Sequence, residues 1–119
     1  MNADEALARY AAICDEWAGL LGEFAAADPD PEAIDRRHAR LAALAEGLDA
    51  VQAGPAEALR LRDAAAEAER LARAAAAAAI ERRDALTAEQ AEAQRTRGAL
   101  DAYRPDGNAG PARYVDRRS

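Results

Sequence analysis

The residues that could carry chemistry in this chain are its many carboxylates, one histidine and one cysteine. The carboxylates alternate with arginine in stretches such as "EAER" and "AIERRD", a pattern typical of a charge-paired helix surface rather than of a catalytic acid–base pair. His38 has no second ligand at metal-binding spacing, and Cys14 has no histidine nearby to make it a nucleophile. We therefore expect no catalytic residue, no metal, no cofactor and no enzymatic activity, with His38 at the boundary of a helix core.

The elements that position these residues are predicted from the spacing of apolar side chains. Near the start of the chain, Ile13 and Leu20 flank a stripe of residues three or four positions apart. That stripe consists of Leu7, Tyr10, Cys14, Trp17, Leu21 and Phe24. We expect a helix over about 3–27 that contacts more than one neighbour, with Cys14 packed in its seam.

Small residues in two places have two interpretations each. Gly19 and Gly22 lie on the outer face of the first helix, where each costs about 1 kcal/mol relative to alanine. Either another part of the protein approaches closely there, or the glycines are simply tolerated. The run Ala74–Ala79 is either a smooth docking strip or, as we favour, only a stretch of good helix formers.

A second helix is predicted over about 31–53. Asp30 can cap it and Pro31 suits its first position. Its apolar row consists of Ile34, Leu41, Leu44, Leu48 and Val51. Gly54 and Pro55 end this helix, and Pro55 can open the next one.

The third helix is predicted to run over about 55–103, because nothing in that range breaks the helical pattern. Its apolar row repeats every seventh residue, at Ala65, Ala72, Ala79, Leu86, Ala93 and Leu100. The sequence "TAEQ", which begins at Thr87, has the form of a capping box and offers an alternative, a break into two helices. A continuous helix of this length extends about 70 Å at 1.5 Å per residue.

These patterns predict an all-α fold, an antiparallel bundle of three helices, or of four if the third helix breaks near Thr87. The bundle occupies 1–103. An irregular, flexible and basic tail follows over 104–119, because its prolines and glycines prevent a helix from continuing. Alanine supplies most of the apolar residues, so the core is thin and its stability is improved by a partner.

Charge and composition exclude several classes of function. The net charge of −6 argues against nucleic-acid binding, which requires a basic surface. No apolar run approaches the roughly 20 residues of a membrane-spanning helix, so we expect no membrane insertion. A single cysteine and the lack of a signal peptide point to the cytoplasm.

Three features together resemble the small helical chaperones of bacterial flagellar export, the FliT family first and the FlgN family second. They are the amphipathic first helix, the segment "IDRRHARLAAL" at Ile34–Leu44, and a long third stretch that ends in an aromatic residue. The ending "RYVDRRS" at Arg113–Ser119 also resembles the aromatic-Asp-basic ending of FliT-like proteins.

The resemblance implies a chaperone that binds the C-terminal helical region of the filament-cap protein, prevents its early assembly, and delivers it to the type III export gate or export ATPase. A FlgN-like chaperone would do the same for the hook–filament junction proteins. A competing hypothesis is a structural coiled coil that forms a homodimer through the seam of the first helix and has no client.

The partner-binding residues are predicted on the apolar face of the first helix and at the end of the third. They are Leu7, Tyr10, Trp17, Leu21, Phe24, Leu100 and Tyr103. The first thirty residues carry one Arg against seven acids, whereas the chain from Arg95 onward carries six Arg against three acids. This contrast allows the tail, anchored by Tyr114 and Val115, to fold back over the first helix and compete with the client. The FliT resemblance implies the same masking role, and the alternative is a chain end without a role.

Overall fold

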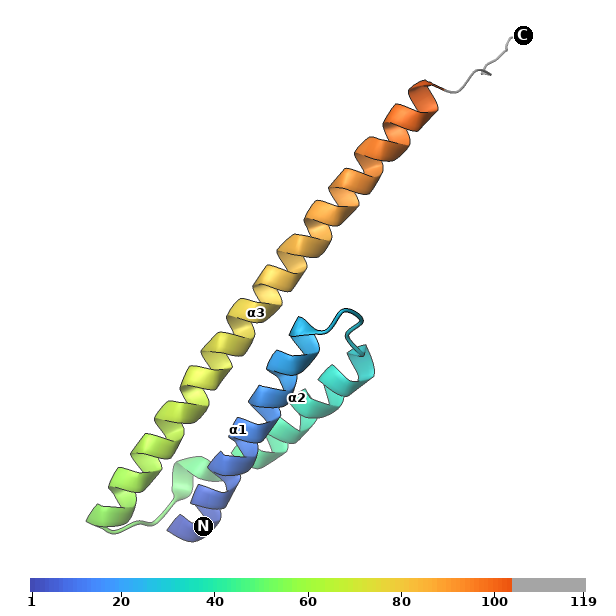
Figure 1. Cartoon of the computed structure of the whole chain (residues 1–119). Helices are drawn as coiled ribbons and strands as arrows, with labels where there is room; N and C mark the ends of the chain where they lie inside the picture. The colour runs from blue at the N-terminus through green and yellow to red at the C-terminus, as the bar shows by residue number, and fades with distance from the viewer. Residues whose placement is uncertain (104–119) are drawn as a thin grey trace. The chain divides into compact units, whose positions relative to one another are not determined.

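The computed structural model describes residues 1–103 and confirms the all-α prediction (Figure 1). Three helices, α1 (Ala3–Ala25), α2 (Pro31–Ala45) and α3 (Pro55–Ala102), and one short 3-10 turn, η1 (Leu48–Ala50), make up its regular structure. No strand occurs among the described residues. The predicted tail over 104–119, with Tyr114 and Val115, lies outside them.

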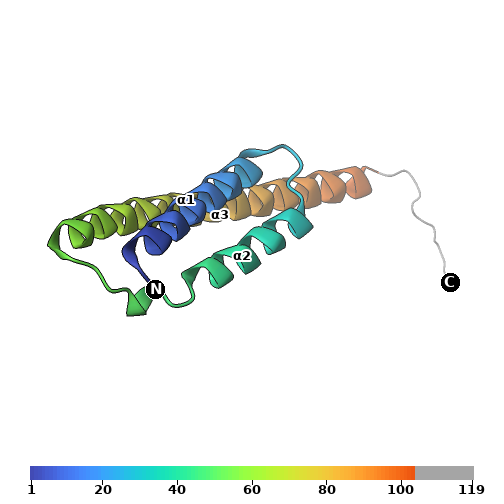
Figure 2. The same ribbon diagram turned by 90° about the horizontal axis from the view of Figure 1, so that it is seen from below.

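The chain divides into two compact units, Met1–Arg82 and the part that begins at Arg83. The first unit contains α1, α2 and the first part of α3. Within it, α2 returns alongside α1 in the opposite direction (Figures 1 and 2), and these two helices make the most extensive backbone approach of any pair. The described part of the second unit is the rest of α3 and Tyr103.

The helix starts follow the local sequence closely. The Asn2 side chain accepts a hydrogen bond from the Glu5 backbone N–H at 2.8 Å and so caps α1. Asp30 caps α2 in the same way, with Pro31 as the first helical residue, so both parts of that prediction are confirmed. Pro55 opens α3 as expected.

The predicted end of the second helix was wrong. The first helix ends at Ala25, close to the predicted end near 27, whereas the second stops at Ala45 rather than near 53. Gly47 adopts a left-handed conformation with φ of 81°, which an α-helix cannot contain. The apolar row suggested a longer helix because Leu48 and Val51 are still half-buried in the connection that follows.

The alternative of a fourth helix is not seen, because α3 continues through Thr87. A Thr87 cap would accept a hydrogen bond from the N–H of Gln90. Instead, the Thr87 hydroxyl donates to the Arg83 carbonyl one turn earlier, at 3.0 Å, as threonine does inside a helix. The helical interpretation of this segment is therefore the correct one.

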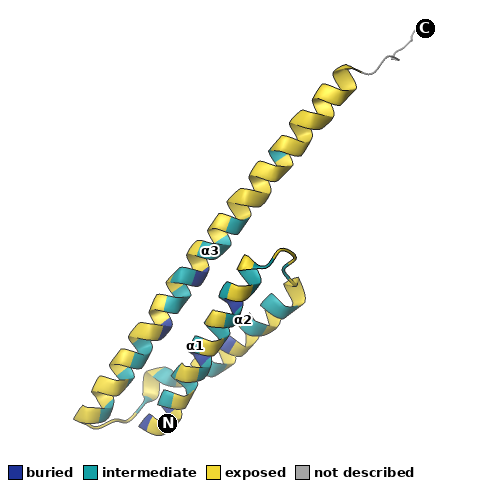
Figure 3. Ribbon diagram, in the orientation of Figure 1, coloured by how far each residue is buried: buried dark blue, intermediate teal, exposed yellow. Residues whose placement is uncertain are grey.

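The core of the first unit is small and lies between its three helical segments (Figure 3). The buried cluster contains Ile13 and Leu20 of α1, Leu41 of α2 and Ala68 of α3. Among the described residues, Leu20 is the largest side chain that is fully buried. Because α3 contributes mainly alanine to this cluster, little apolar area is removed from water there.

The buried stripe of α1 is offset from the predicted seam. Tyr10, Trp17 and Phe24 are part of it as expected, but they are half-buried, and its most buried members are Ala6, Ile13 and Leu20. Leu7, Cys14 and Leu21, the other three members of the predicted seam, are also half-buried, and of these Cys14 packs against the core cluster. The predicted row and the buried row share Tyr10, Trp17 and Phe24, and they differ by one position along the helix in their other members.

Two arginines join helices of the first unit by binding exposed helix ends. Neither α1 nor α2 has a basic residue in its last turn, and the carbonyl groups there carry partial negative charge. Arg9 of α1 donates to the Glu46 carbonyl at the end of α2 at 2.7 Å. Arg82 of α3 donates to the Ala26 carbonyl at the end of α1 at 2.8 Å.

Candidate interaction surface

The reactive side chains singled out from the sequence take part in packing and in ion pairs. Cys14 packs against the core, and Glu16 pairs with two arginines. No group of three or more potential metal ligands occurs within residues 1–103. The Cys14 thiol packs against the core cluster, and burial raises its pKa, with a smaller upward contribution from Glu67. A thiol with a raised pKa is largely protonated at neutral pH and is a poor nucleophile. Packing against the core, the role predicted for Cys14, is what the structure shows.

Glu16 forms the best-organised ion-pair cluster of the first unit. Its carboxylate accepts hydrogen bonds from Arg37 and Arg40 of α2, both at 3.0 Å. The hydrogen bond from Arg40 is the main reason that the pKa of Glu16 lies below its ordinary value. This cluster joins α1 to α2 and uses two of the arginines of the segment Ile34–Leu44.

Gly19 leaves space for the side chain of Arg37 in this cluster, whereas Gly22 faces open space. A Cβ atom added to Gly19 would overlap the guanidinium group of Arg37, so the side chain from α2 lies directly on the α1 backbone. A Cβ atom added to Gly22 would meet nothing within 4 Å among the described residues. The close-approach interpretation therefore holds for Gly19, and for Gly22 the structure offers no reason for glycine.

A hollow in the first unit lies beside the core and has a volume of about 220 Å³. One wall is formed by Trp17 and Phe24 of α1 and by His38 of α2. The Trp17 and His38 rings meet edge to face, with ring centroids 6.4 Å apart and planes at 76°. His38 is exposed and contacts the half-buried Trp17 at the edge of the core, in agreement with the boundary position predicted for it.

The opposite wall of the hollow is made only of alanine side chains of α3. They are Ala72, Ala75, Ala76 and Ala79. A larger residue at any of these positions would occupy the space that now remains open beside Trp17. The volume suits one or two apolar side chains and is smaller than the roughly 300–1,000 Å³ of a typical small-molecule site.

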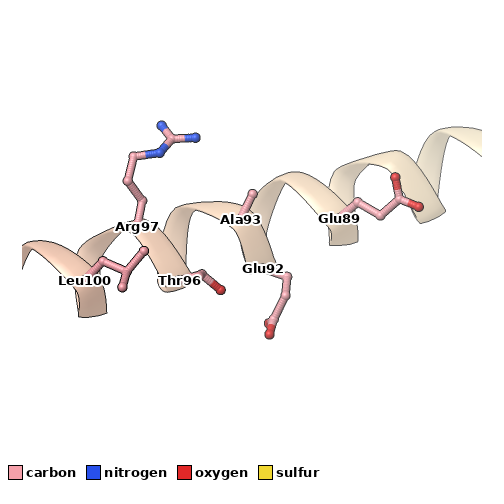
Figure 4. Close-up of a pocket in the computed structure, with 6 residues that line it drawn as sticks. All are labelled: Glu89, Glu92, Ala93, Thr96, Arg97 and Leu100. Carbon is pink, nitrogen blue, oxygen red and sulfur yellow. The ribbon is translucent and has the colours of Figure 1, made fainter.

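The second unit presents a different surface. Nearly every described residue of α3 beyond Arg83 is exposed, and the exposed fractions are 46% for Leu86, 66% for Leu100 and 87% for Tyr103. One face of this segment forms a shallow open hollow (Figure 4). Its lining residues are Glu89, Glu92, Ala93, Thr96, Arg97 and Leu100.

The predicted partner-binding residues are therefore not one cluster. Tyr10, Trp17 and Phe24 all pack against the core cluster, and the last two line the same hollow. Leu7 and Leu21 are half-buried elsewhere on α1. Leu100 and Tyr103 belong to the other unit, and Tyr114 and Val115 lie outside the described residues.

The sequence analysis missed His38 and the alanine wall as parts of this surface. The seven-residue repeat of Ala72 and Ala79 was a usable signal, because alanines at every seventh position of a helix line up along one face. We had favoured the interpretation of Ala74–Ala79 as helix formers only. The structure places Ala75, Ala76 and Ala79 of that run against the hollow.

The chain matches no protein-family model, and no curated protein and no solved structure is significantly similar to it. Within the described part of the chain, none of the helices combines the length and the apolar character needed to cross a membrane.

Proposed function

We propose that this protein is a flagellar export chaperone of the FliT type, whose client docks an amphipathic helix at the hollow between α1, α2 and α3. The observation that carries the proposal is the hollow itself, in which half-buried Trp17 and Phe24 face a wall of alanines and leave room for a side chain. Helix-in-groove recognition uses apolar anchors of this kind.

The energetic case rests on the thin core of the first unit. An apolar client side chain that fills the hollow gains burial against Trp17 and Phe24, at about 25 cal/mol per Å² of apolar surface. The same contact adds to a core in which α3 supplies only alanine at the buried positions Ala68 and Ala75. Client binding therefore stabilises the chaperone as well as shielding the client.

The client and the delivery step come from the FliT resemblance. We propose the C-terminal helical region of the filament-cap protein as the client, with the export gate or export ATPase as the receiving partner. If the chain is FlgN-like, the client is a hook–filament junction protein. In either case, the chaperone holds the assembly helix of its client until export.

Calorimetric titration with C-terminal fragments of the cap protein and of a junction protein, both taken from the same genome, tests this function. We expect one fragment to bind with one site per chain. Binding of the cap fragment supports the FliT-like assignment, binding of the junction fragment supports the FlgN-like one, and binding of neither contradicts both.

A matched pair of variants locates the docking surface without disturbing the core. Ala76 and Ala77 are both exposed positions of α3, but only Ala76 lines the hollow. We expect Ala76→Arg to weaken client binding at least about tenfold because a charged group then occupies the apolar hollow. Ala77→Arg should bind like the wild type. Truncation of Trp17 is a poorer test, because loss of a core-packed aromatic ring costs about 3–5 kcal/mol and can unfold a marginal domain.

A further inference from the structure

The part of α3 in the second unit carries a row of mostly apolar residues, interrupted by Glu89 and Thr96, that no described residue covers. Its members lie three and four residues apart along one face: Leu86, Glu89, Ala93, Thr96, Leu100 and Tyr103. The same spacing runs through the earlier part of α3 as Leu61, Ala65, Ala68, Ala72, Ala75 and Ala79. In the first unit, that row is the face packed against the core, with Ala68 and Ala75 buried.

From this repeat we infer that residues 86–103 of α3 form a two-helix contact with the same segment of a second copy of this chain. Across Arg82, which lies between Ala79 and Leu86, the row continues a packed interface in register. A coiled-coil seam extends along a helix in this way. Its three large apolar residues remain substantially exposed in the single chain. A second copy presents an identical row, so each chain covers the other.

The distribution of charge favours the antiparallel direction. Residues 83–93 carry one Arg and three acids, whereas residues 94–103 carry two Arg and one acid. An antiparallel copy places the acidic half of each helix beside the basic half of the other, and a parallel copy places like beside like. Complementary charge on the flanks selects partner and orientation in such helix pairs.

Glu89 leads to the same choice of direction. It lies on the apolar row, and in a parallel pair its carboxylate would face the same carboxylate of the second chain. In the antiparallel pair that sets Leu86 level with Tyr103, Glu89 lies level with Leu100 and Ala93 with Thr96. No layer then contains two like charges, and each large apolar residue meets a residue of the other helix.

The length of the segment limits the strength of the contact. Residues 83–103 amount to about three heptads, which is at the short end of what sustains a coiled coil. The dimer is therefore weak, and the fraction of chains in the dimer increases with protein concentration. The residues of this contact are different from those that line the hollow in the first unit.

Sedimentation velocity on the full chain, over about a hundredfold range of concentration, tests the inference. We expect a reversible monomer–dimer equilibrium. Leu100→Lys should raise the dissociation constant of the dimer at least about tenfold, because it puts a charge in the contact of both chains. Glu89→Leu should lower the constant because it removes the carboxylate from the row.

Leu59→Lys is the matched control, because Leu59 is also an exposed leucine of α3, at 54%, but does not lie on the row. It should leave the equilibrium within about twofold of the wild type. Circular dichroism confirms that each variant is folded. A chain that stays monomeric throughout, or a dimer that tolerates Leu100→Lys, overturns the inference. So does a dimer that Leu59→Lys weakens equally.

Disulfide trapping in a Cys14→Ser background tests the direction. A mixture of the Leu86→Cys and Tyr103→Cys chains should cross-link, whereas Leu86→Cys alone should not, because antiparallel pairing separates the two copies of position 86 by about 25 Å. Cross-linking of Leu86→Cys alone contradicts the antiparallel arrangement. A chain that dimerises only after deletion of 104–119 also overturns the proposal, since its own tail then covers the row.

Discussion

At the scale of single residues, the two glycines of α1 have opposite roles. The side chain of Arg37 lies on the backbone at Gly19, whereas Gly22 faces open space. Both positions have the same helical propensity in isolation. The difference between them comes wholly from a residue of α2, which no pattern in the first helix reveals.

Alanine substitution separates the two roles. Gly22→Ala should stabilise the protein by about 0.5–1 kcal/mol, because alanine loses less conformational entropy in a helix. Gly19→Ala should give no net gain, because the added methyl group displaces Arg37 from Glu16. Urea unfolding of both variants measures the difference, and an equal gain at both positions would show that Arg37 does not need the space at Gly19.

The Glu16 cluster predicts a pH dependence of stability. The folded-state pKa of Glu16 lies below the ordinary value of 4.5, so its ion pairs contribute stability above that value and lose it as the pH falls through the lowered pKa. Glu16→Gln should therefore cost about 1 kcal/mol at neutral pH, a value that allows for partial exposure of the two arginines. The cost should vanish in acid.

Unfolding free energies of wild type and Glu16→Gln, measured from neutral pH down to pH 3, provide the test. Glu67→Gln is the control, because Glu67 also has a lowered pKa from its pairing with Arg70 but both side chains are exposed. Its effect should be smaller. A difference between wild type and Glu16→Gln that persists unchanged in acid would mean that packing, and not charge, explains the effect.

At the scale of elements, the sequence predicted what local chemistry determines. The Asp30 cap, the Pro31 and Pro55 starts and the continuity of α3 follow from neighbouring residues alone. The end of α2 did not follow, because the left-handed turn at Gly47 competes with an apolar row that continues through Leu48. Apolar spacing reports burial, and a residue in a connection can be buried as well.

Only part of the lining of the hollow could be predicted from the sequence, because the rest depends on tertiary packing. Trp17 and Phe24 belong to one row of one helix, and their shared face could be inferred from spacing. His38 and the alanines of α3 reach the same place only through tertiary packing. The choice of Ile13 and Leu20 as the most buried residues is also a property of the bundle, because the neighbouring row through Cys14 and Leu21 is apolar as well.

Arg9 and Arg82 each bind carbonyl groups at the end of another helix, and we expect these contacts to stabilise the packing of the helices in the first unit. Arg82→Ala leaves the Ala26 and Ala27 carbonyls without their charged donor and should destabilise the first unit by about 1–2 kcal/mol. Arg83→Ala is the control, because Arg83 is exposed and its guanidinium group pairs with the adjacent Asp84 side chain at 3.5 Å rather than with a helix end. The urea midpoints of the two variants should differ clearly. Equal midpoints would show that the hydrogen bonds from Arg82 to the end of α1 contribute nothing to stability.

At the scale of the whole molecule, the proposal gives the chain a client surface on the first unit and a self-association surface on the second. The sequence also carries a basic segment after Arg104 and an acidic beginning. We propose that this segment competes with the client for the face of α1, as the FliT resemblance implies. The competition is electrostatic in part, so it weakens at high salt.

Deletion of Arg104–Ser119 tests the competition. Client affinity, measured by calorimetry, should increase in the truncated chain, and the increase should shrink as salt screens the attraction between the chain ends. Unchanged affinity would leave the segment without a role in binding. Reduced affinity would make it part of the client site.

Trp17 fluorescence is the most direct test of the central claim, because Trp17 is the only tryptophan and lines the hollow. The chain is titrated with a cap-protein fragment whose own tryptophans are replaced by phenylalanine. If the client side chain enters the hollow, water is excluded from the indole ring and the emission should shift to shorter wavelength with the same saturation point as calorimetric binding. The Ala76→Arg chain should show neither signal. Saturable binding that leaves the Trp17 emission unchanged would contradict the claim and place the client elsewhere.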